Sequence, residues 1–562
     1  MLKKDSLIKG TLILAAAALI ARFLGLFQRI PLDYMLGDEG NIAFSAANMV
    51  YLIVLMIATA GFPSAISKMV SERYALGRPD EAQRIYRAGL LFGAAAGLVL
   101  AVSLFVLAPV FAAVAKKPGI DLAVRAIAPA LLFFPIIAMM RGYFQGRQMM
   151  SAGGTSQIVE QFVRVILGLL LGWLVLELGW GDRWAAAAIT FGSVFGGIAA
   201  FAVMLRFARK LKRQDQETMD TYNAEASAAL RPSRGASGVS GASSSRLRYR
   251  TIYKEIMSMS IPALITSIAI NFISLFDITF FMRLTERFYT EAEATLELAD
   301  YGIKAISLAG IPPILAIALS SSIIPVISSA YSLKRMNEVQ SQASMVLRIV
   351  CFTGVPFALL LTVASYSITG LIFASPSGSG AVAALSAATI LQITMMTSNS
   401  ILYGMGKQRL SMRHTIIGLV TKMACSAGLA PFMGIYGFIL ASTICFGVVT
   451  ALNLSAINKE VKLIVLGKRW LPYMLAVAIA AAAGWGAEVG LLSLTESWAD
   501  KLSFFAAAAA ASIVVGGLYG VLLLVLRVIT PQDVASFPRP LRGPLNKLLR
   551  LLKRGPAEAS SQ

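Results

Sequence analysis

The fold of this chain is decided by the stretch RGYFQGRQMMSAGGT, residues 141–155, because its pattern recurs later in the chain. The stretch aligns without gaps to ILYGMGKQRLSMRHT, residues 401–415, where a tyrosine, a glycine, a glutamine, a serine and a threonine keep their positions. A second match joins ARFLGLFQ, residues 21–28, to INFISLFD, residues 270–277. Such self-similarity predicts two copies of one structural unit, each forming a lobe of the molecule.

The composition places both copies in a membrane. Of the 562 residues 57% are hydrophobic, and apolar segments of about 20 residues, long enough to cross ~30 Å of hydrocarbon, recur along the chain. A membrane barrel would instead show short alternating segments. We therefore predict an all-α polytopic membrane protein with about fourteen transmembrane helices. The predicted spans are 7–30, 42–67, 88–113, 122–146, 153–178, 184–208, 255–282, 301–331, 345–374, 381–405, 411–432, 435–457, 470–492 and 503–527.

Six spans separate the copies, which predicts two six-helix lobes of the same orientation, related by an axis along the membrane normal. The hydrophilic segment between them is rich in Ser, Ala and Gly, and we expect it to be a disordered cytoplasmic linker. The predicted division is an N-terminal lobe at 1–210, the linker at 211–250, a C-terminal lobe at 251–460, two further spans at 461–530 and a basic tail at 531–562.

The net charge of +21 has its explanation in the loops. Lys and Arg gather in alternate loops and near both ends of the chain, whereas the opposite loops carry few of them. The positive-inside rule then predicts a multi-pass cell-membrane protein with both termini in the cytoplasm. The excess cations face anionic membrane lipids and need no nucleic acid as partner. The apolar run after MLKKDSLIKG is too long for a signal peptide and is predicted to be the first span.

The sequence shows no pattern typical of an enzyme. It contains one histidine and three cysteines, and the cysteines lie in apolar segments, which predicts neither a metal centre nor a disulfide. No Walker loop is found, so we expect no ATP hydrolysis by this chain.

The first span, ARFLGLFQRIPL, and the stretches ATAGFPSAISKMVSERYALG (58–77) and GYFQGRQ (142–148) resemble the multidrug/oligosaccharidyl-lipid/polysaccharide (MOP) exporter superfamily. Within it they are most similar to the MurJ-like and SpoVB-like polysaccharide biosynthesis proteins. The resemblance implies a V-shaped, alternating-access carrier of two lobes with two extra C-terminal helices. It also implies a flippase for undecaprenyl-pyrophosphate-linked saccharides, usually lipid II.

Two arginines of the first span are candidates for binding this cargo. Arg22 lies about 22 Å along the helix from Leu7, where a charge needs a partner or a water-filled cavity. A guanidinium binds phosphate oxygens bidentately. Arg22 matches a cavity arginine of the MurJ-like proteins, and Arg29 stands near a second one. A structural ion pair is the alternative for Arg22; for Arg29, beside the predicted helix end at Pro31, the alternatives are snorkelling or pairing with Asp33.

The family's further arginine in the second span has no counterpart in YLIVLMIATAGF (51–62), which favours the SpoVB-like branch. Glu160 and Arg164 in the fifth span stand at i and i+4, where they either pair with each other or line the cavity for cargo. Lys422 in the corresponding helix of the second lobe either binds cargo or snorkels to water.

Asp277 lies deep in the seventh span, where a carboxylate is protonated, paired or cation-bound. The resemblance implies sodium binding near this position in some MurJ-like proteins. We expect Asp277 to couple transport to Na⁺ or H⁺, with Asn399 of the tenth span as a second candidate. Pairing with Arg283 is the alternative. No cofactor other than the coupling ion is expected.

The leading functional hypothesis is a lipid II flippase. A flippase for a teichoic-acid or exopolysaccharide precursor fits the residues about as well. A MATE-like small-molecule exporter fits less well, because such cavities tend to be acidic. A membrane glycosyltransferase or polymerase, or a scaffold for the cell-wall synthesis machinery, is a remote alternative, because the outer loops are short and a scaffold needs no buried arginines.

Overall fold

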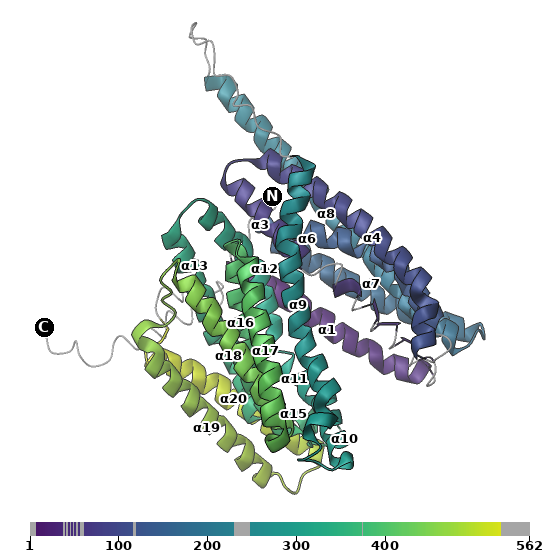
Figure 1. The fold of residues 1–562 in the computed structure, drawn as a ribbon, viewed down its shortest axis with the longest axis vertical. Coiled ribbons are helices and arrows are strands. Elements are labelled where there is room, and N and C mark those ends of the chain that lie inside the picture. Colours follow the sequence, from purple (N-terminus) through teal and green to yellow (C-terminus); the bar gives the residue numbers. More distant parts are fainter. Residues whose placement is uncertain are drawn as a thin grey trace, which may run out of the picture. The chain divides into compact units, whose positions relative to one another are not determined.

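The computed structural model shows a predominantly helical chain (Figure 1). It forms two compact units, Met1–Leu264 and Ile265–Gln562, and the boundary between them falls within a single helix, α9 (Tyr249–Thr285). The residues that the structure describes are 7–36, 40, 43–44, 47–48, 50–51, 54–56, 61–115, 120–229, 248–373 and 375–529.

All regular elements in these residues are helices, which confirms the predicted class. Eleven helical segments in the described residues are long and apolar enough to cross a membrane, and one more apolar helix, Ala316–Ser332, is shorter. The chain is therefore a multi-pass membrane protein. Ten of the 26 residues of the predicted second span, 42–67, lie outside the described residues, so the number of fourteen spans stays a prediction.

Among the described residues, unit 1 contains the first half of α9 and eight further elements. These are α1 (Leu7–Met35), α3 (Phe62–Ala75), α4 (Pro79–Ala115), α5 (Ile120–Ile127), η1 (Ala128–Leu132), α6 (Phe134–Gly146), α7 (Met150–Glu177) and α8 (Asp182–Ala229). The expected helix end at Pro31 is wrong, because α1 continues through Pro31 to Met35. A proline removes one backbone hydrogen bond, and helices in membrane proteins tolerate that loss where neighbouring groups compensate.

Two glycines of α8 allow close contact with α7. A methyl group added at Gly192 would lie 2.6 Å from the Cα atom of Gly168, and one added at Gly196 would lie 2.7 Å from the carbonyl oxygen of Glu160. Any larger residue at either glycine would have to move a backbone. The backbone of α8 therefore supports α7 at the level of the predicted site residues.

α8 also extends well beyond its predicted span, 184–208. It runs to Ala229, so residues 211–229 are helical, which corrects the expectation of disorder for this part of the linker. The extension contains many good helix formers (Ala, Lys, Gln, Glu) and neither proline nor glycine. The rest of the predicted linker that precedes Arg248, residues 230–247, lies outside the described residues.

Unit 2 contains the second half of α9, two short π-helices (η2 and η3) and a series of longer helices. In order these elements are α10 (Glu291–Asp300), η2 (Tyr301–Ala305), α11 (Ile306–Ala309), α12 (Pro313–Ser332), α13 (Met336–Ile349), η3 (Val350–Gly354), α14 (Val355–Val363), α15 (Ser365–Ile372), α16 (Ser379–Gly404), α17 (Gln408–Met433), α18 (Ile435–Asn458), η4 (Gly467–Arg469), α19 (Trp470–Leu494) and α20 (Asp500–Val525). π-Helices are frequent at functional sites, so both are of interest.

The two units share turns as well as sequence. The turn from α3 to α4 has Gly77 in the left-handed conformation, φ 70°, and the turn from α12 to α13 has Lys334 there, φ 56°. Both turns have leucine before and arginine after the central residue. Left-handed backbone is uncommon outside glycine. Its presence at Lys334 therefore supports the duplication in a segment that the sequence alignment had not matched.

An ion pair also recurs in the two units. Arg147, after α6, contacts Asp215 of α8 at 2.5 Å, and Lys407, after α16, contacts Glu460, just beyond α18, at 2.5 Å. The two cations occupy positions that the sequence alignment matches. Each pair ties the loop before the fifth helix of its lobe to the C-terminal part of the sixth helix or to the turn that follows it.

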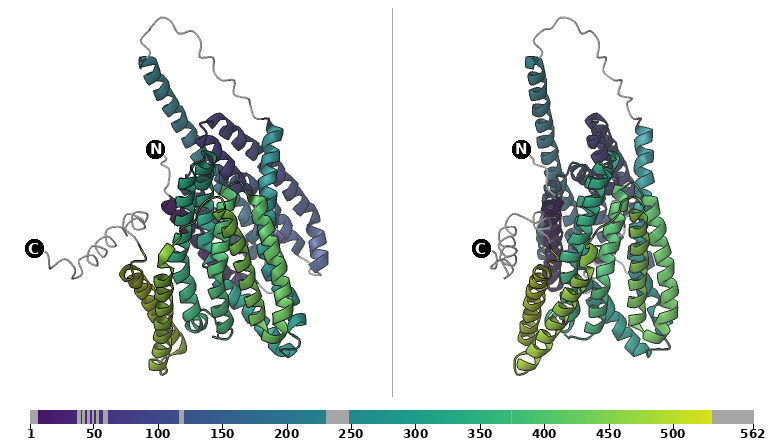
Figure 2. Two further views of the ribbon diagram at one scale, coloured as in Figure 1. Left: turned by 60° about the vertical axis from the view of Figure 1, so that its left-hand side comes forward. Right: turned by 90° about the vertical axis from the view of Figure 1, so that its left-hand side faces the viewer.

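The C-terminal hairpin of α19 and α20, olive to yellow in Figure 2, packs against α14 and α15 of unit 2. The hydroxyls of Tyr473 and Tyr519 both donate hydrogen bonds to the carbonyl oxygen of Cys351, at 2.9 and 2.8 Å. Cys351 lies in η3, where the widened backbone leaves a carbonyl accessible to such donors. The hairpin is thus bonded to unit 2 at its π-helix.

Candidate functional site

Charged side chains of unit 1 meet between α6 and α7. A guanidinium nitrogen of Arg141 on α6 donates to the Glu160 carboxylate at 2.6 Å and to the Ser156 hydroxyl at 2.9 Å, both on α7. The Arg141 and Glu160 side chains are 21% and 16% exposed, so water or a ligand can reach the pair.

Arg164, one turn beyond Glu160 on α7, contacts the second predicted span instead. Its guanidinium donates to the Asn48 side-chain oxygen at 2.9 Å and lies 5.9 Å from the centre of the Tyr51 ring, within cation–π range. Glu160 and Arg164 therefore each have a partner on another helix, although their spacing allowed them to pair with each other.

α1 runs beside α7 in the same direction. A methyl group added at Gly154 would lie 3.0 Å from Ile13, and one added at Gly25 would lie 3.4 Å from the amide nitrogen of Gln161. These contacts bring the backbone at residue 22 level with the charged part of α7. The side chains of Arg22 and Arg29 lie outside the described residues, so their contact with cargo stays a prediction.

The charged residues of unit 2 form a separate, enclosed pair. Lys422 Nζ on α17 lies 2.6 Å from Asp277 Oδ1 on α9, and the two side chains are 0% and 1% exposed. The Tyr301 hydroxyl, at the start of η2, donates to Asp277 Oδ2 at 2.9 Å. Lys422 Nζ donates to the Ser442 hydroxyl at 2.6 Å. The ammonium that we expected to snorkel or to bind cargo is thus held inside unit 2.

The cation beside Asp277 is Lys422 rather than Arg283. Arg283, the alternative partner on α9, is exposed. Residues six apart on a helix differ by about 240° in direction, so their side chains diverge.

Asn399 on α16 belongs to a second buried network in unit 2. Its side-chain oxygen accepts hydrogen bonds from the Ser411 hydroxyl and the Asn453 amide, both at 2.7 Å. Asn453 in turn contacts a ring nitrogen of His414 at 2.8 Å. The two donors occupy the lone pairs that Asn399 would offer to a cation.

The two clusters differ in charge and access. In unit 1 the cluster contains two guanidinium groups, of Arg141 and Arg164, and one carboxylate, of Glu160, which leaves a net positive charge in a partly exposed position. In unit 2 one ammonium and one carboxylate neutralise each other in a buried position. The cluster of unit 1 is therefore the better candidate site for an anionic ligand.

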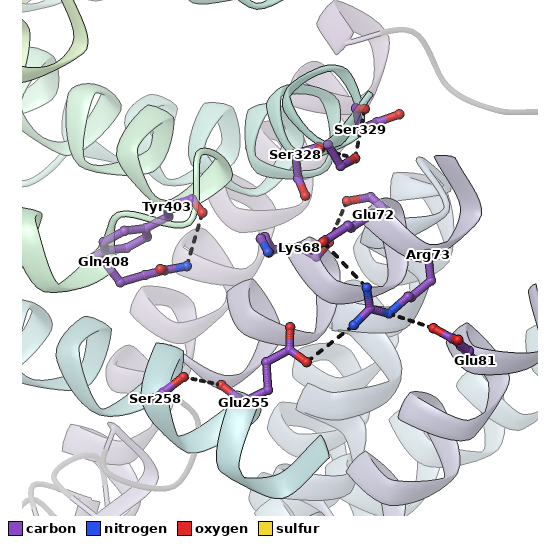
Figure 3. A network of polar contacts seen from close by, with 12 residues as sticks. Lys68, Glu72, Arg73, Glu81, Glu255, Ser258, Ser328, Ser329, Tyr403 and Gln408 are labelled. Atoms are coloured by element: carbon purple, nitrogen blue, oxygen red, sulfur yellow. Dashed lines mark hydrogen bonds and ion pairs between the residues drawn. The ribbon is translucent and has the colours of Figure 1, made fainter. Parts of the chain in front are cut away.

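Two arginines that lie in polar networks of the structure, Arg141 and Arg73, are not among the candidates predicted from the sequence. Arg141 lies within the predicted span 122–146, and a basic residue near a span end is normally assigned to snorkelling. Arg73 on α3 lies 3.1 Å from Glu81 and 3.5 Å from Glu255, so that it links α3 to α4 and to the first half of α9 (Figure 3). The sequence feature that could have identified Arg73 is its position in the stretch 58–77, which resembles the MOP exporter superfamily.

Solved structures define the class of the fold. A bent-form crystal structure of the Vibrio cholerae MATE transporter VcmN matches with a TM-score of 0.63 and 14% identity, over 81% of this chain and 96% of that one. A MATE transporter in the straight conformation matches with a TM-score of 0.63 and 13% identity, over 81% and 97%. The chain has the fold of MOP-superfamily transporters.

Sequence comparisons narrow this class. The chain belongs to the polysaccharide biosynthesis protein family, which matches residues 7–331. It is 26% identical to the lipid II flippase MurJ of Bacillus subtilis (strain 168) over 455 residues, 78% of this chain and 80% of MurJ. It is 24% identical to stage V sporulation protein B of the same organism over 544 residues, 95% and 98% of the two chains. The predicted MurJ-like and SpoVB-like resemblance is confirmed.

Proposed function

We propose that this chain is a flippase that moves an undecaprenyl-pyrophosphate-linked saccharide, with lipid II as the leading cargo, from the inner to the outer leaflet by alternating access. Both termini lie in the cytoplasm in this proposal, and the chain catalyses no covalent reaction. Its relatives include a lipid II flippase, and its family is that of polysaccharide biosynthesis proteins.

The observation that carries the proposal is the net positive, partly exposed cluster of unit 1. The cluster contains two guanidinium groups, of Arg141 and Arg164, and a single carboxylate, and the backbone of α1 at residue 22 lies level with it. Guanidinium groups suit the paired phosphates of a pyrophosphate, because each presents a planar fork of donors. Lys422 has no exposed surface for cargo, so we assign cargo binding to unit 1 through Arg22, Arg29, Glu160 and Arg164.

Two alternatives concern the transported molecule. A teichoic-acid or exopolysaccharide precursor carries the same kind of phosphate linkage and would use the same arginines. A cationic drug, as a MATE-like exporter would carry, is repelled by a cluster of two guanidinium groups and one carboxylate. The charge of the site therefore favours anionic lipid cargo.

Transport without a nucleotide-binding loop draws on an ion gradient, the membrane potential, or removal of cargo outside. One charge that crosses the whole membrane potential releases about 2.3 kcal/mol per 100 mV. This amount suffices to shift a conformational equilibrium roughly 50-fold.

The test is complementation of a strain depleted of its lipid II flippase, together with direct measurement of lipid II translocation in liposomes. We expect the wild-type chain to restore growth and to move lipid II. Growth without restored translocation would point to another cargo, and translocation of a teichoic-acid precursor but not of lipid II would select the first alternative.

Substitutions at two arginines connect transport to the site. Arg164→Ala and Arg22→Ala should each abolish translocation with normal membrane insertion, and Arg22→Lys should recover it only in part, because the charge remains but the bidentate fork is lost. Arg125→Ala is the matched control, since Arg125 lies on α5 and packs over the Phe105 ring. Wild-type transport by both alanine variants would refute the site.

A further inference from the structure

The pair of Asp277 and Lys422 in unit 2 has the environment of a bound cation. Lys422 Nζ lies 2.6 Å from Asp277 Oδ1, 2.6 Å from the Ser442 hydroxyl and 3.5 Å from the Phe438 carbonyl oxygen. Carboxylate, hydroxyl and carbonyl oxygens are the ligands that hard cations prefer. Four helical elements, α9, η2, α17 and α18, enclose this set of oxygens.

The negative charge of the Asp277 carboxylate is balanced by the Lys422 ammonium. The Tyr301 hydroxyl donates to Oδ2, whereas Oδ1 has no well-directed hydrogen-bond donor among the described residues. The charge on Oδ1 is therefore balanced by the nearby positive nitrogen. A buried ion that loses its partner is strongly destabilised, because neither water nor another charge compensates it.

The internal repeat shows that the carboxylate belongs to unit 2 alone. Asp277 aligns with Gln28 of unit 1, which is buried and uncharged. Lys422 and Arg164 each stand fourteen residues after the first residue of their helix, α17 and α7. Arg164 donates to Asn48, whereas Lys422 contacts a buried carboxylate.

A sodium ion, which the family resemblance implies near this aspartate, does not fit beside Lys422. A second cation within about 4 Å of the ammonium would face strong repulsion in a medium that excludes water. One carboxylate cannot neutralise both cations. The oxygens that a sodium ion would use are already in contact with the ammonium.

We propose that the Lys422 ammonium is a tethered cation that permanently takes the place of a free coupling ion at Asp277. Transport by this chain therefore does not depend on sodium. This inference rests on the proposed function, because it states how the flipping of cargo is coupled. It also predicts that a chain without Lys422 contains an oxygen-lined space that accepts a small external cation.

The first experiment uses the unaltered chain in liposomes. Translocation of fluorescent lipid II and the thermal unfolding midpoint are measured in sodium chloride and in choline chloride of equal ionic strength. We expect both quantities to agree within error in the two salts. A transport rate that falls severalfold without sodium in the wild type, but not in an Asp277→Asn variant, would overturn the proposal.

The second experiment empties the position of the ammonium. Lys422→Ala should transport about tenfold more slowly or worse and unfold at a lower temperature. Ethylammonium or sodium should restore part of the transport rate and part of the unfolding temperature, since either ion can enter the space that the lysine side chain leaves. The double variant Asp277→Asn/Lys422→Met carries neither charge and should fold well and ignore both ions. Equal responses of the single and double variants would contradict the tethered-cation role.

Direct binding separates this inference from the proposed function. Radioactive sodium should bind to detergent-purified Lys422→Ala and not at this position in the wild type, whatever the chain transports. Sodium binding by the wild type that Asp277→Asn abolishes would overturn the tethered cation. Absence of lipid II translocation in either salt would instead refute the proposed cargo.

Discussion

Glu488 of α19 accepts a hydrogen bond from the backbone N–H of Ser367, with 2.9 Å between the two atoms. Ser367 lies in the first turn of α15, which begins anew after the helix break at Ala364. Such N–H groups have no partner within their own helix, and a carboxylate there also suits the helix dipole. At the opposite end of α15, Lys501 of α20 donates to the Gly370 carbonyl at 2.6 Å. The C-terminal hairpin thus caps both ends of one short helix.

We predict that Glu488→Ala destabilises the protein by about 1–3 kcal/mol, because it leaves a buried N–H group without an acceptor. Glu488→Gln should cost less, since the amide oxygen still accepts the bond. The measurement is the unfolding midpoint in detergent. The exposed Glu496, two residues beyond the end of α19, provides the control, and Glu496→Ala should have no effect. Equal losses for the two alanine variants would show that the cap contributes nothing.

The ion pair of Lys407 and Glu460 predicts a dependence of stability on pH. The hydrogen bond from Lys407 lowers the pKa of the Glu460 carboxyl, against a smaller opposing effect of burial. A carboxyl group whose pKa is lower in the folded state contributes stability above its unfolded pKa and loses it as the pH falls through the folded value.

Glu460→Gln should therefore lower stability at pH 7, by no more than about 1 kcal/mol because the pair is about one-third exposed. The difference from the wild type should shrink below the unfolded pKa of about 4.3 and vanish in stronger acid. Unfolding midpoints measured across this pH range test the sign. A difference that grows on acidification would mean that the pair is not the cause.

Asp277 shows how much of the candidate site can be predicted from the sequence alone. Its depth in an apolar span predicted that the carboxylate needs compensation, and the structure shows compensation by Lys422. The partner itself is 145 residues further along the chain, and only the way α9 and α17 face each other identifies it. Glu160 and Arg164 are a second example. Their spacing on one helix allowed them to pair with each other, but each side chain contacts a residue of a different helix, which the sequence does not reveal.

The duplication was visible because aligned turns and loops keep short polar motifs, and hydropathy identified the helices. The helical part of the linker was missed for a different reason. The composition of 211–250 as a whole suggested disorder, but its first part, up to Ala229, lacks proline and glycine and continues a helix that already exists. Extending a formed helix avoids the cost of nucleation, so weak local preference suffices.

Arg73 is expected to hold the first half of α9 to α3 and α4. Its guanidinium contacts Glu81 and Glu255, and its side chain is only 14% exposed. Arg73→Ala should cost about 1–3 kcal/mol, because the carboxylates around it then repel one another. Hydrogen exchange should become faster in residues 249–258. Arg78→Ala serves as control, since Arg78 contacts the same Glu81, at 3.5 Å, but is 60% exposed. Unchanged exchange at the start of α9 in the Arg73 variant would exclude this role.

The last prediction concerns Gly196, which supports the site without touching cargo. A methyl group at Gly196 would lie 2.7 Å from the carbonyl oxygen of Glu160 and 3.0 Å from Cβ of Arg164. Gly196→Ala should therefore push α7 from α8 and misplace both side chains, although no charge is lost.

We expect transport by Gly196→Ala to fall about tenfold or more, since misplacement of binding groups by about 1 Å can reduce a rate 100-fold. Gly447→Ala on α18, the corresponding sixth helix of the second lobe, is the matched control, because the nearest atom there is 3.7 Å away. The measurement is lipid II translocation by the two variants and the wild type, reconstituted at equal protein density. If Gly196→Ala transports like Gly447→Ala, close contact between α7 and α8 does not position the site.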